Sequence, residues 1–375
     1  MNSPFQQDRI AAARIMVVGC GALGNEVLKN LALMGAENLV VIDFDRVEQG
    51  NLCRSVLFEK ADADASRYKV DAVAERLRKM NPRMSVQTIR GDVSFDVGLG
   101  LVRSMDAVIG CVDNRLARYC INRLCMRAGK PWIDGGIDAL EGTVRVFIPG
   151  KNCYACSLGP EGLKDMARRL PCSGVIRRNE EAGKAPTTPL AASVIGSVQV
   201  QEALKLIHPE LLDEGGMTSL CGKMFYFEGG HLSTRTVEFR AWDDDCPVHE
   251  PWEPVTRSSI SLEMPVETAL GVLREELDCK DATIHLTGDC FVDFVYRKDD
   301  NRHRSAMMPG RAVAAWVERD SELGSIPFSG LYQHEYREID SSFPYKFLTL
   351  GQLGIPARDV LYVSSESADH YVEMN

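Results

Sequence analysis

A short glycine-rich run follows an apolar segment near the start of this 375-residue chain. Arg14 to Val18 reads as a buried strand, and Gly19, Gly21 and Gly24 come directly after it, before a predicted helix that extends to about Met34. Glycines at this spacing let the backbone approach a phosphate, whose charge the helix N-terminus stabilises. The run indicates a nucleotide-binding turn, and a tight strand–helix turn without a ligand is the alternative.

Charged residues downstream indicate which nucleotide chemistry the turn serves. Asp43 ends the next predicted strand, where a ribose-binding acid belongs, and this much fits a nicotinamide-dependent oxidoreductase equally well. Further along come Asp45, Asn51, Arg54, Lys69, Asp113 and Asn114. Read singly, such charges are usually solvated surface groups. As a set they favour nucleotidyl transfer, because charge grows on phosphate oxygens, cations must stabilise it and a carboxylate must hold Mg²⁺.

Strands and helices alternate in the segment that must position these residues. We expect strands at Arg14–Val18, Asn38–Ile42, Val86–Ile89, Ala107–Gly110, Pro131–Asp134 and Thr143–Ile148, and helices ending near Met34, Met80 and Ala128 and spanning Pro189–Ile207. The second of these helices is predicted to begin at Ser66. A hairpin is expected around Gly229-Gly230. The alternation predicts an α/β fold with a doubly wound, mostly parallel Rossmann-like sheet.

Composition excludes several other classes of function. The chain is 45% hydrophobic and 26% charged, with a net charge of −10, so a general affinity for nucleic acid is not expected. No run approaches 18 apolar residues and the start lacks a signal-peptide core, so we expect a cytoplasmic protein that does not cross a membrane. Most of the twelve cysteines are expected to be small buried side chains rather than disulfide partners.

The ordered set of motifs resembles the ThiF/MoeB/E1 superfamily of adenylating enzymes. The similarity is closest to the catalytic subunits of the E1 enzymes that activate ubiquitin-like proteins. The helix from Gly24 to Leu33, the Asp134-Gly135-Gly136 run and the following Gly142 to Val146 segment all match. The resemblance covers almost the whole chain in order. It implies that ATP is used to adenylate the C-terminal carboxylate of a ubiquitin-like carrier protein.

The resemblance also implies roles for particular residues of the nucleotide site. Asp43 should bind the ribose of ATP, and Asn51, Arg54 and Lys69 should surround the phosphates. Asp113 should hold Mg²⁺, with Asp45 assisting. Many relatives place an arginine on an N-terminal helix that reaches a partner subunit's site, and Arg9 is the candidate here. Relatives work as dimers, so we expect a homodimer or a heterodimer with a related subunit.

Two cysteine features follow from the same resemblance. Cys153 and Cys156 lie where the family has one pair of zinc ligands, and Cys246 and His249 lie where it has the second pair. Three thiolates and one imidazole make a closed tetrahedral Zn²⁺ site, whereas a CxxC pair alone would equally fit redox chemistry. Cys172 lies in a segment, about 157–188, that resembles the one carrying the thioester cysteine in conjugating-type relatives.

The surroundings of Cys172 agree with a nucleophilic role. Arg168, Arg169, Arg177 and Arg178 flank it and could lower its pKa, although an incidental loop cysteine is the alternative.

The C-terminal part is expected to be a separate domain, with the boundary near Glu253, so that residues 1–253 form the adenylation domain. The segments Leu348–Ile355 and Asp359–Val363 look like the end of a ubiquitin-fold domain, which in activating enzymes recruits an E2-like conjugating enzyme. A predicted helix, Val266–Leu277, and a strand, Ala282–Leu286, fit its start. An α+β module of other purpose is the alternative for residues 254–375.

Four functions remain to be distinguished. An E1-like enzyme that forms a thioester on Cys172 and passes it to an E2-like enzyme agrees with the most features. A sulfur-carrier adenylyltransferase that stops at the adenylate is the nearest alternative. A non-catalytic partner subunit and an oxidoreductase are disfavoured by the presence of Arg54, Lys69 and Asp113 together.

Overall fold

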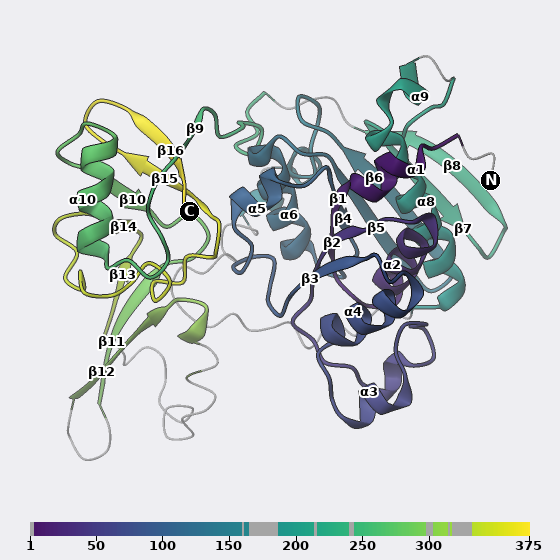
Figure 1. Cartoon of the computed structure of the whole chain (residues 1–375), viewed down its shortest axis with the longest axis horizontal. Coiled ribbons are helices and arrows are strands. Elements are labelled where there is room, and N and C mark those ends of the chain that lie inside the picture. The colour runs from purple at the N-terminus through teal and green to yellow at the C-terminus, as the bar shows by residue number, and fades with distance from the viewer. Residues whose placement is uncertain are drawn as a thin grey trace. The chain divides into compact units, whose positions relative to one another are not determined.

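The computed structural model describes residues 4–159, 161–164, 187–213, 216–239, 244–297, 303–313, 316 and 332–375. They fall into two compact units (Figure 1). Residues 4–94, 102–159 and 187–251 form the first, and the second consists chiefly of 95–101 and 252–375. The chain therefore passes from the first unit to the second after Pro251, two residues before the predicted boundary near Glu253.

An eight-stranded sheet organises the first unit, with the order β3-β2-β1-β4-β5-β6-β7-β8. The strands are β1 (Arg14–Val18), β2 (Asn38–Ile42), β3 (Ser85–Ile89), β4 (Ala107–Gly110), β5 (Trp132–Asp138), β6 (Glu141–Phe147), β7 (Lys223–Glu228) and β8 (Ser233–Glu238). The five strands β3, β2, β1, β4 and β5 pair in parallel, and β6 to β8 continue the sheet antiparallel. The predicted doubly wound, mostly parallel sheet is confirmed.

Helices cover both faces of this sheet because its strand order reverses at β1. The helices of this unit are α1 (Gln7–Ala12), α2 (Ala22–Met34), α3 (Lys60–Asp64), α4 (Lys69–Met80), α6 (Arg115–Ala128), α8 (Pro189–Ile207) and α9 (Pro209–Asp213), with 3₁₀ turns η1 (Gln49–Asn51) and η2 (Ala155–Ser157). The short helix α5 (Leu99–Arg103) includes residues of both units. Right-handed crossovers toward β2 and toward β5 place α2 and α6 on opposite faces (Figure 1). The ends of β1 and β4 therefore diverge at a topological switch point, where ligands bind in such sheets.

Local signals explain where these helices begin and end. Gly35 and Gly129 follow α2 and α6 with φ of 86° and 65°, the left-handed conformation in which glycine ends a helix. Thr188 accepts a hydrogen bond from the Ala191 N–H and Pro189 opens α8, so that this helix begins at the predicted residue.

The longest helix, α8, packs against α2 and against the strands β5 and β6. By length and composition it is the one helix among the described residues that could cross a membrane, but 56% of its apolar window is buried within the fold. It also carries the buried polar side chains Gln199, Glu202 and Lys205. The helix α8 is therefore apolar because it packs in the core of the first unit.

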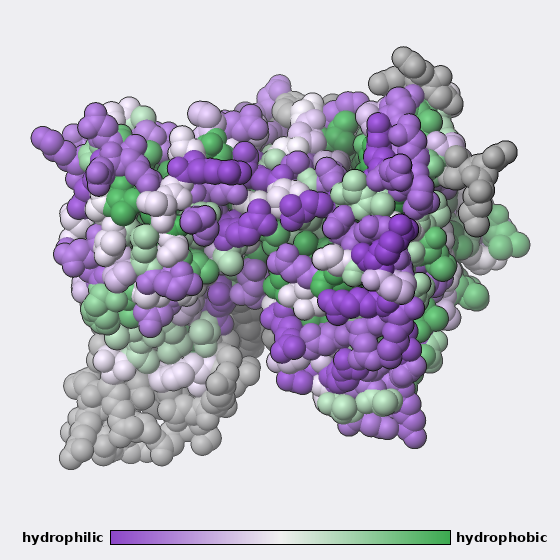
Figure 2. Space-filling model, in the orientation of Figure 1, coloured by the Kyte–Doolittle hydropathy of each residue, from purple (hydrophilic) through white to green (hydrophobic). Residues whose placement is uncertain are grey.

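The surface over α3 and α4 is strongly hydrophilic (Figure 2). Arg67 and Lys79 both pair with Glu75 there, at 2.9 and 2.6 Å. The predicted start of α4 at Ser66 is wrong. Ser66 has a φ of 48°, outside the right-handed helical region, and α4 begins at Lys69 after a separate short helix, α3.

The second unit is an α+β structure, as expected. Its elements are β9 (Val255–Arg257), α10 (Val266–Glu276), β10 (Thr283–His285), β11 (Phe291–Arg297), β12 (His303–Pro309), β13 (Tyr332–Tyr336), β14 (Glu338–Ile339), β15 (Val360–Ser364) and β16 (Asp369–Glu373). They form a five-stranded sheet, β14-β10-β15-β16-β9, and a three-stranded sheet, β12-β11-β13. Apolar residues of α10 and the larger sheet share one core. The assignment of a ubiquitin fold to this unit stays a prediction.

Candidate nucleotide and metal sites

The glycine-rich turn joins β1 to α2, and the surroundings of its three glycines explain why a side chain is absent at each position. Gly19 has a φ of 97°, and a Cβ there would lie 2.5 Å from the Cys111 carbonyl oxygen. A Cβ on Gly24 would lie 2.0 Å from the Gly19 carbonyl oxygen. A Cβ on Gly21 would meet nothing within 4 Å. Packing therefore requires the first and third glycines, while the second leaves open space of the kind a phosphate needs.

Asp43 lies at the carboxyl end of β2, directly beside this turn. Its Oδ2 accepts a hydrogen bond from the Cys20 N–H at 2.7 Å, and its Oδ1 accepts one from the Asp45 N–H at 2.8 Å. Burial raises the pKa of Asp43, and Lys69 and the two N–H donors only partly offset this effect. A carboxylate has about four acceptor positions, so Asp43 retains capacity for the hydroxyl groups of a ribose.

Lys69 opens α4 and points its ammonium back toward the end of β2. Lys69 Nζ lies 2.7 Å from Asp45 Oδ2, and the Lys69 side chain is only 11% exposed. Burial lowers the pKa of Lys69, but the Asp43 and Asp45 carboxylates raise it by more, so the ammonium remains charged. The pair Lys69–Asp45 thus places one cation and one anion next to the glycine-rich turn.

Arg54 lies in the loop after η1, and this loop is tied to the turn by a residue that sequence reasoning missed. Asn25, fully buried in α2, donates to the carbonyl oxygens of Cys20 and Gly21 and accepts from the Leu57 N–H at 2.7 Å. A buried amide in the first turn of an apolar helix is the signal that could have revealed it.

Arg54 and Asn51 themselves make local contacts. Arg54 donates from Nη1 to the Gly50 carbonyl oxygen at 2.6 Å, and buried Asn51 accepts from the Glu48 N–H. Both side chains thereby shape the loop that carries them.

Asp113 and Asn114 lie between β4 and α6, on the other side of the switch point from Asp43. Asp113 is exposed, and Asn114 Oδ1 caps α6 by accepting from the Ala117 N–H at 2.8 Å. No hydrogen bond or ion pair within the described part of the chain joins Arg54 or Asp113 to Asp43 or Lys69. Of the predicted nucleotide-site residues, the structure thus links the glycines, Asp43, Asp45 and Lys69 directly.

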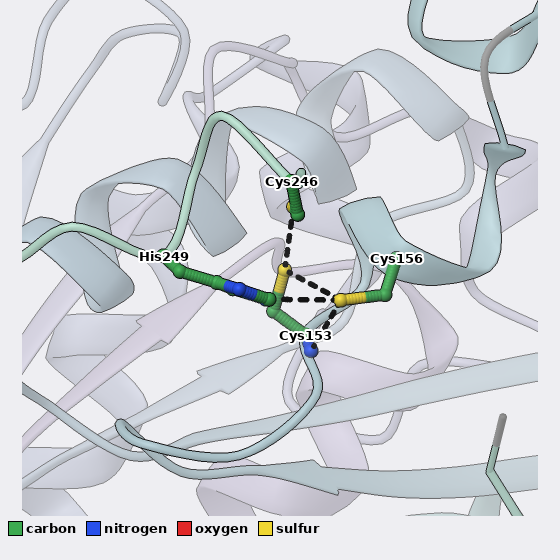
Figure 3. Close-up of side chains that lie close together, drawn as sticks. All are labelled: Cys153, Cys156, Cys246 and His249. Carbon is green, nitrogen blue, oxygen red and sulfur yellow. Dashed lines mark hydrogen bonds between the residues drawn. The ribbon is translucent and has the colours of Figure 1, made fainter. Parts of the chain in front are cut away.

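The four predicted metal ligands converge in a second site of the first unit (Figure 3). Cys153, Cys156, Cys246 and His249 offer ligand atoms that all lie within 4.8 Å of one another. Cys153 Sγ is 3.8 Å from both Cys156 Sγ and Cys246 Sγ, and Cys156 Sγ is 2.9 Å from His249 Nε2. Such a cluster could hold a metal ion.

The electrostatics of this cluster agree with a set of metal ligands. The hydrogen bond between Cys246 and Cys153 lowers the pKa of Cys153 and raises that of Cys246, and a bound metal ion would require both thiols to be deprotonated. Three sulfurs and one imidazole nitrogen are the donors of a closed tetrahedral site.

The remaining site predictions concern single residues. Cys172 and its flanking arginines lie outside the described residues. Cys221, a half-buried thiol in the first unit, is the next candidate for the nucleophile if Cys172 does not serve. Burial raises the pKa of Cys221, and its sulfur accepts a hydrogen bond from Ser219 Oγ at 3.0 Å. Arg9 pairs with Glu210 of the same chain at 2.6 Å. Reaching a partner subunit would therefore require Arg9 to leave Glu210.

A doubly wound sheet with a glycine-rich turn after its first strand and a buried acid at the end of the next strand is the arrangement typical of nucleotide-binding proteins. The chain belongs to the ThiF family, whose family model matches residues 3–248. This match includes the predicted nucleotide and metal sites up to Val248 and leaves the second unit from Trp252 outside it.

Relatives of known name agree with this membership. The SAMP-activating enzyme E1 of Haloferax volcanii is 33% identical over 245 residues, which cover 65% of this chain and 83% of that protein. Adenylyltransferase and sulfurtransferase MOCS3 of Mus musculus is 33% identical over 254 residues, 67% of this chain and 50% of that protein. The crystal structure of E. coli MccB with succinimide matches with a TM-score of 0.52 at 23% identity, covering 64% of this chain and 68% of that one, and shows a shared fold.

Proposed function

We propose that this chain is an ATP-dependent adenylyltransferase that activates the C-terminal carboxylate of a small ubiquitin-like or sulfur-carrier protein. The observation that carries the proposal is the grouping of Asp43, Asp45 and Lys69 beside the open backbone at Gly21. A carrier carboxylate oxygen attacks the α-phosphorus of ATP. The new O–P bond gives an acyl adenylate, and the bond to pyrophosphate breaks.

Each residue has a role that its position supports. Asp43 accepts hydrogen bonds from the ribose hydroxyl groups. Lys69 and Arg54 place positive charge near phosphate oxygens, and Asn51 holds the Arg54 loop in shape. Asp113 holds Mg²⁺, which supplies charge neutralisation to the phosphate oxygens when bound. Because the exposed Asp113 carboxylate makes no ion pair with any residue that the structure describes, it is available to such a cation.

Carrier-dependent exchange of labelled pyrophosphate into ATP tests the adenylation step. Asp113→Ala should lower exchange by about a hundredfold or more. Asp8→Ala, which removes an exposed carboxylate from α1, should leave the exchange rate unchanged. Equal exchange rates in wild type and Asp113→Ala would remove Asp113 from the site.

Zinc is the metal that we propose for the Cys153, Cys156, Cys246 and His249 cluster. Its donor set supports the assignment, since a closed Cys₃His site is typical of structural zinc. The ion would clip the segment after β6 to the segment that precedes the second unit. Its role is then to hold the fold together rather than to take part in the reaction.

We further propose that the activated carrier moves to the Cys172 thiol, and that residues 254–375 recruit an E2-like conjugating enzyme. The name of the Haloferax volcanii relative, an E1, supports this version. The name of the Mus musculus relative supports the alternative of adenylation followed by sulfur transfer. A thiol-sensitive carrier adduct on a non-reducing gel would favour the first, and its absence with a carrier that is adenylated would favour the second.

Association is the last part of the proposal. We propose that the chain works as a homodimer or together with a related subunit, because relatives include a protein named as one subunit of a SUMO-activating enzyme. Light scattering on the purified chain should give twice the monomer mass if the chain forms a homodimer, and the monomer mass if it needs a related subunit. A fully active monomer would contradict a dimeric enzyme.

A further inference from the structure

A group of three charges is centred on Asp134 of β5, which pairs with Gly110 at the end of β4, next to the β4–α6 loop. Asp134 is completely buried. Its Oδ1 accepts from Arg118 Nε at 3.0 Å, and its Oδ2 accepts from Arg145 Nε at 3.0 Å and from Nη2 at 2.5 Å. Two guanidinium groups therefore share one carboxylate. Removing charges from water is costly, so an arrangement of this kind is weak evidence of a purely stabilising role.

Arg118 makes contacts that Arg145 does not. Its Nη2 donates to the Val112 carbonyl oxygen at 2.8 Å and to the Gly135 carbonyl oxygen at 3.1 Å. Val112 immediately precedes Asp113. A single guanidinium thus connects the loop that carries Asp113 to the backbone of β5, through donors whose fork geometry is rigid.

The chain makes room for this guanidinium. A Cβ on Gly136 would lie 3.3 Å from Arg118 Nη2 and 3.2 Å from Thr143 Oγ1, which is tighter than ordinary contact. On the other side of β5, Gln199 Nε2 donates to the Gly110 carbonyl oxygen at 2.9 Å. The end of β4 is therefore held from α8 by Gln199, and the loop beyond it is held from α6 by Arg118.

Asp113 depends on its backbone for position. Its carboxylate has one long contact within the described residues, 3.4 Å from Asn114 Nδ2. Burial lowers the pKa of Arg118, but Asp134 raises it by more, so the guanidinium that holds the Val112 carbonyl stays charged. An exposed carboxylate that is not held by its own hydrogen bonds takes its direction from the loop that bears it.

We propose that Arg118 is a positioning residue that fixes the Asp113 loop for a divalent cation, an inference that rests on the proposed role of Asp113 in holding Mg²⁺. Arg118 does not touch the cation itself. By binding the Val112 carbonyl, Arg118 sets the direction of the Asp113 carboxylate. Its own position is fixed by its hydrogen bonds to Asp134 and Gly135. Outer partners of metal ligands commonly contribute about tenfold to a hundredfold to metal affinity.

Mn²⁺ affinity tests this inference directly, because Mn²⁺ can replace Mg²⁺ and is detected by electron paramagnetic resonance. The full chain is titrated with Mn²⁺ in the presence of a non-hydrolysable ATP analogue. Arg118→Lys keeps the charge but loses the fork, and Arg118→Gln loses both. Both variants should bind Mn²⁺ at least about tenfold more weakly than wild type.

Arg145→Gln is the matched control. It removes a second guanidinium from the same Asp134 carboxylate but no contact with the Asp113 loop. It should lower the Tm as Arg118→Gln does while leaving Mn²⁺ affinity within about twofold of wild type. An equal loss of Mn²⁺ affinity in Arg145→Gln would show that Arg118 acts only through general stability and would overturn the inference, as would unchanged affinity in both Arg118 variants.

A third variant separates this inference from the function on which it rests. Asp113→Asn should lose Mn²⁺ affinity to at least the same extent as the Arg118 variants. If Asp113→Asn binds Mn²⁺ normally, the proposed role of Asp113 is wrong and the inference about Arg118 falls with it. If Asp113→Asn loses affinity and the Arg118 variants do not, the role of Asp113 stands and the inference alone is wrong.

Discussion

Lys69 Nζ donates to Asp45 Oδ2 at 2.7 Å, although Lys69 begins α4 and Asp45 follows β2. The contact brings together two residues 24 positions apart in the sequence. Of the neighbouring carboxylates, Asp43 raises the pKa of Lys69 the most. An ammonium that is held in place before a nucleotide binds costs little to reorganise when charge develops on phosphate oxygens.

Lys69→Ala should therefore lower the maximal rate of carrier-dependent pyrophosphate exchange by about a hundredfold or more. Lys79→Ala is the control, because Lys79 lies at the other end of α4 and pairs with Glu75 on the surface. That variant should retain the wild-type rate. A Lys69→Ala enzyme of normal rate would exclude Lys69 from catalysis.

Asp43 should make stability depend on pH in a defined direction. Burial raises the pKa of Asp43 above its ordinary value of 3.8, so the folded state holds this proton more tightly than the unfolded state does. The free energy of unfolding therefore falls as pH rises from the ordinary value through the raised one.

Asp43→Asn removes this titration. Urea unfolding at a series of pH values should show wild type losing stability relative to the variant as pH rises through that window. A difference between the two proteins that stays constant with pH would contradict a raised pKa for Asp43.

The proposed zinc site predicts one metal ion per chain, detectable by elemental analysis. Cys153→Ser should lose that ion and lower the Tm, because binding of a structural metal contributes to folding. Cys125→Ser, which changes an equally buried cysteine of α6 outside the cluster, should keep the ion. If a chelator strips the metal without changing the Tm, the ion has no structural role.

Much of the first unit was predictable because its signals are local. The strands Arg14–Val18 and Asn38–Ile42 have the predicted bounds because each is a short, mostly apolar run, and the helix Pro189–Ile207 has them because Thr188 and Pro189 mark its start. The start of α4 was missed because nothing in the residue type of Ser66 announces its left-handed conformation.

The candidate sites divide in the same way. The glycine-rich turn has a characteristic spacing, and the metal ligands could be named because the sequence resembles a family that binds a metal at these positions. Asn25 offered the one signal of an amide at the start of an apolar helix, although its Leu57 partner lies 32 positions away. Gln199 and Arg118 could not be named from the sequence, because they bind carbonyl groups 89 and 17 positions away. Their importance depends on which backbone groups the fold leaves beside them, and that is settled only by tertiary structure.

The last prediction distinguishes Cys172 from Cys221 as the nucleophile of a thioester. Attack on an acyl adenylate requires a thiolate, and four arginines flank Cys172 in the sequence. Burial raises the pKa of Cys221, which makes that thiol a poor nucleophile near neutral pH. Cys172→Ala should therefore keep pyrophosphate exchange and lose the thiol-sensitive carrier adduct, whereas Cys221→Ala should keep both. If Cys172→Ala still forms the adduct and Cys221→Ala does not, the acyl group is transferred to the Cys221 thiol instead. If neither variant nor wild type forms the adduct with a carrier that they adenylate, the product leaves as the adenylate and the sulfur-carrier function is favoured.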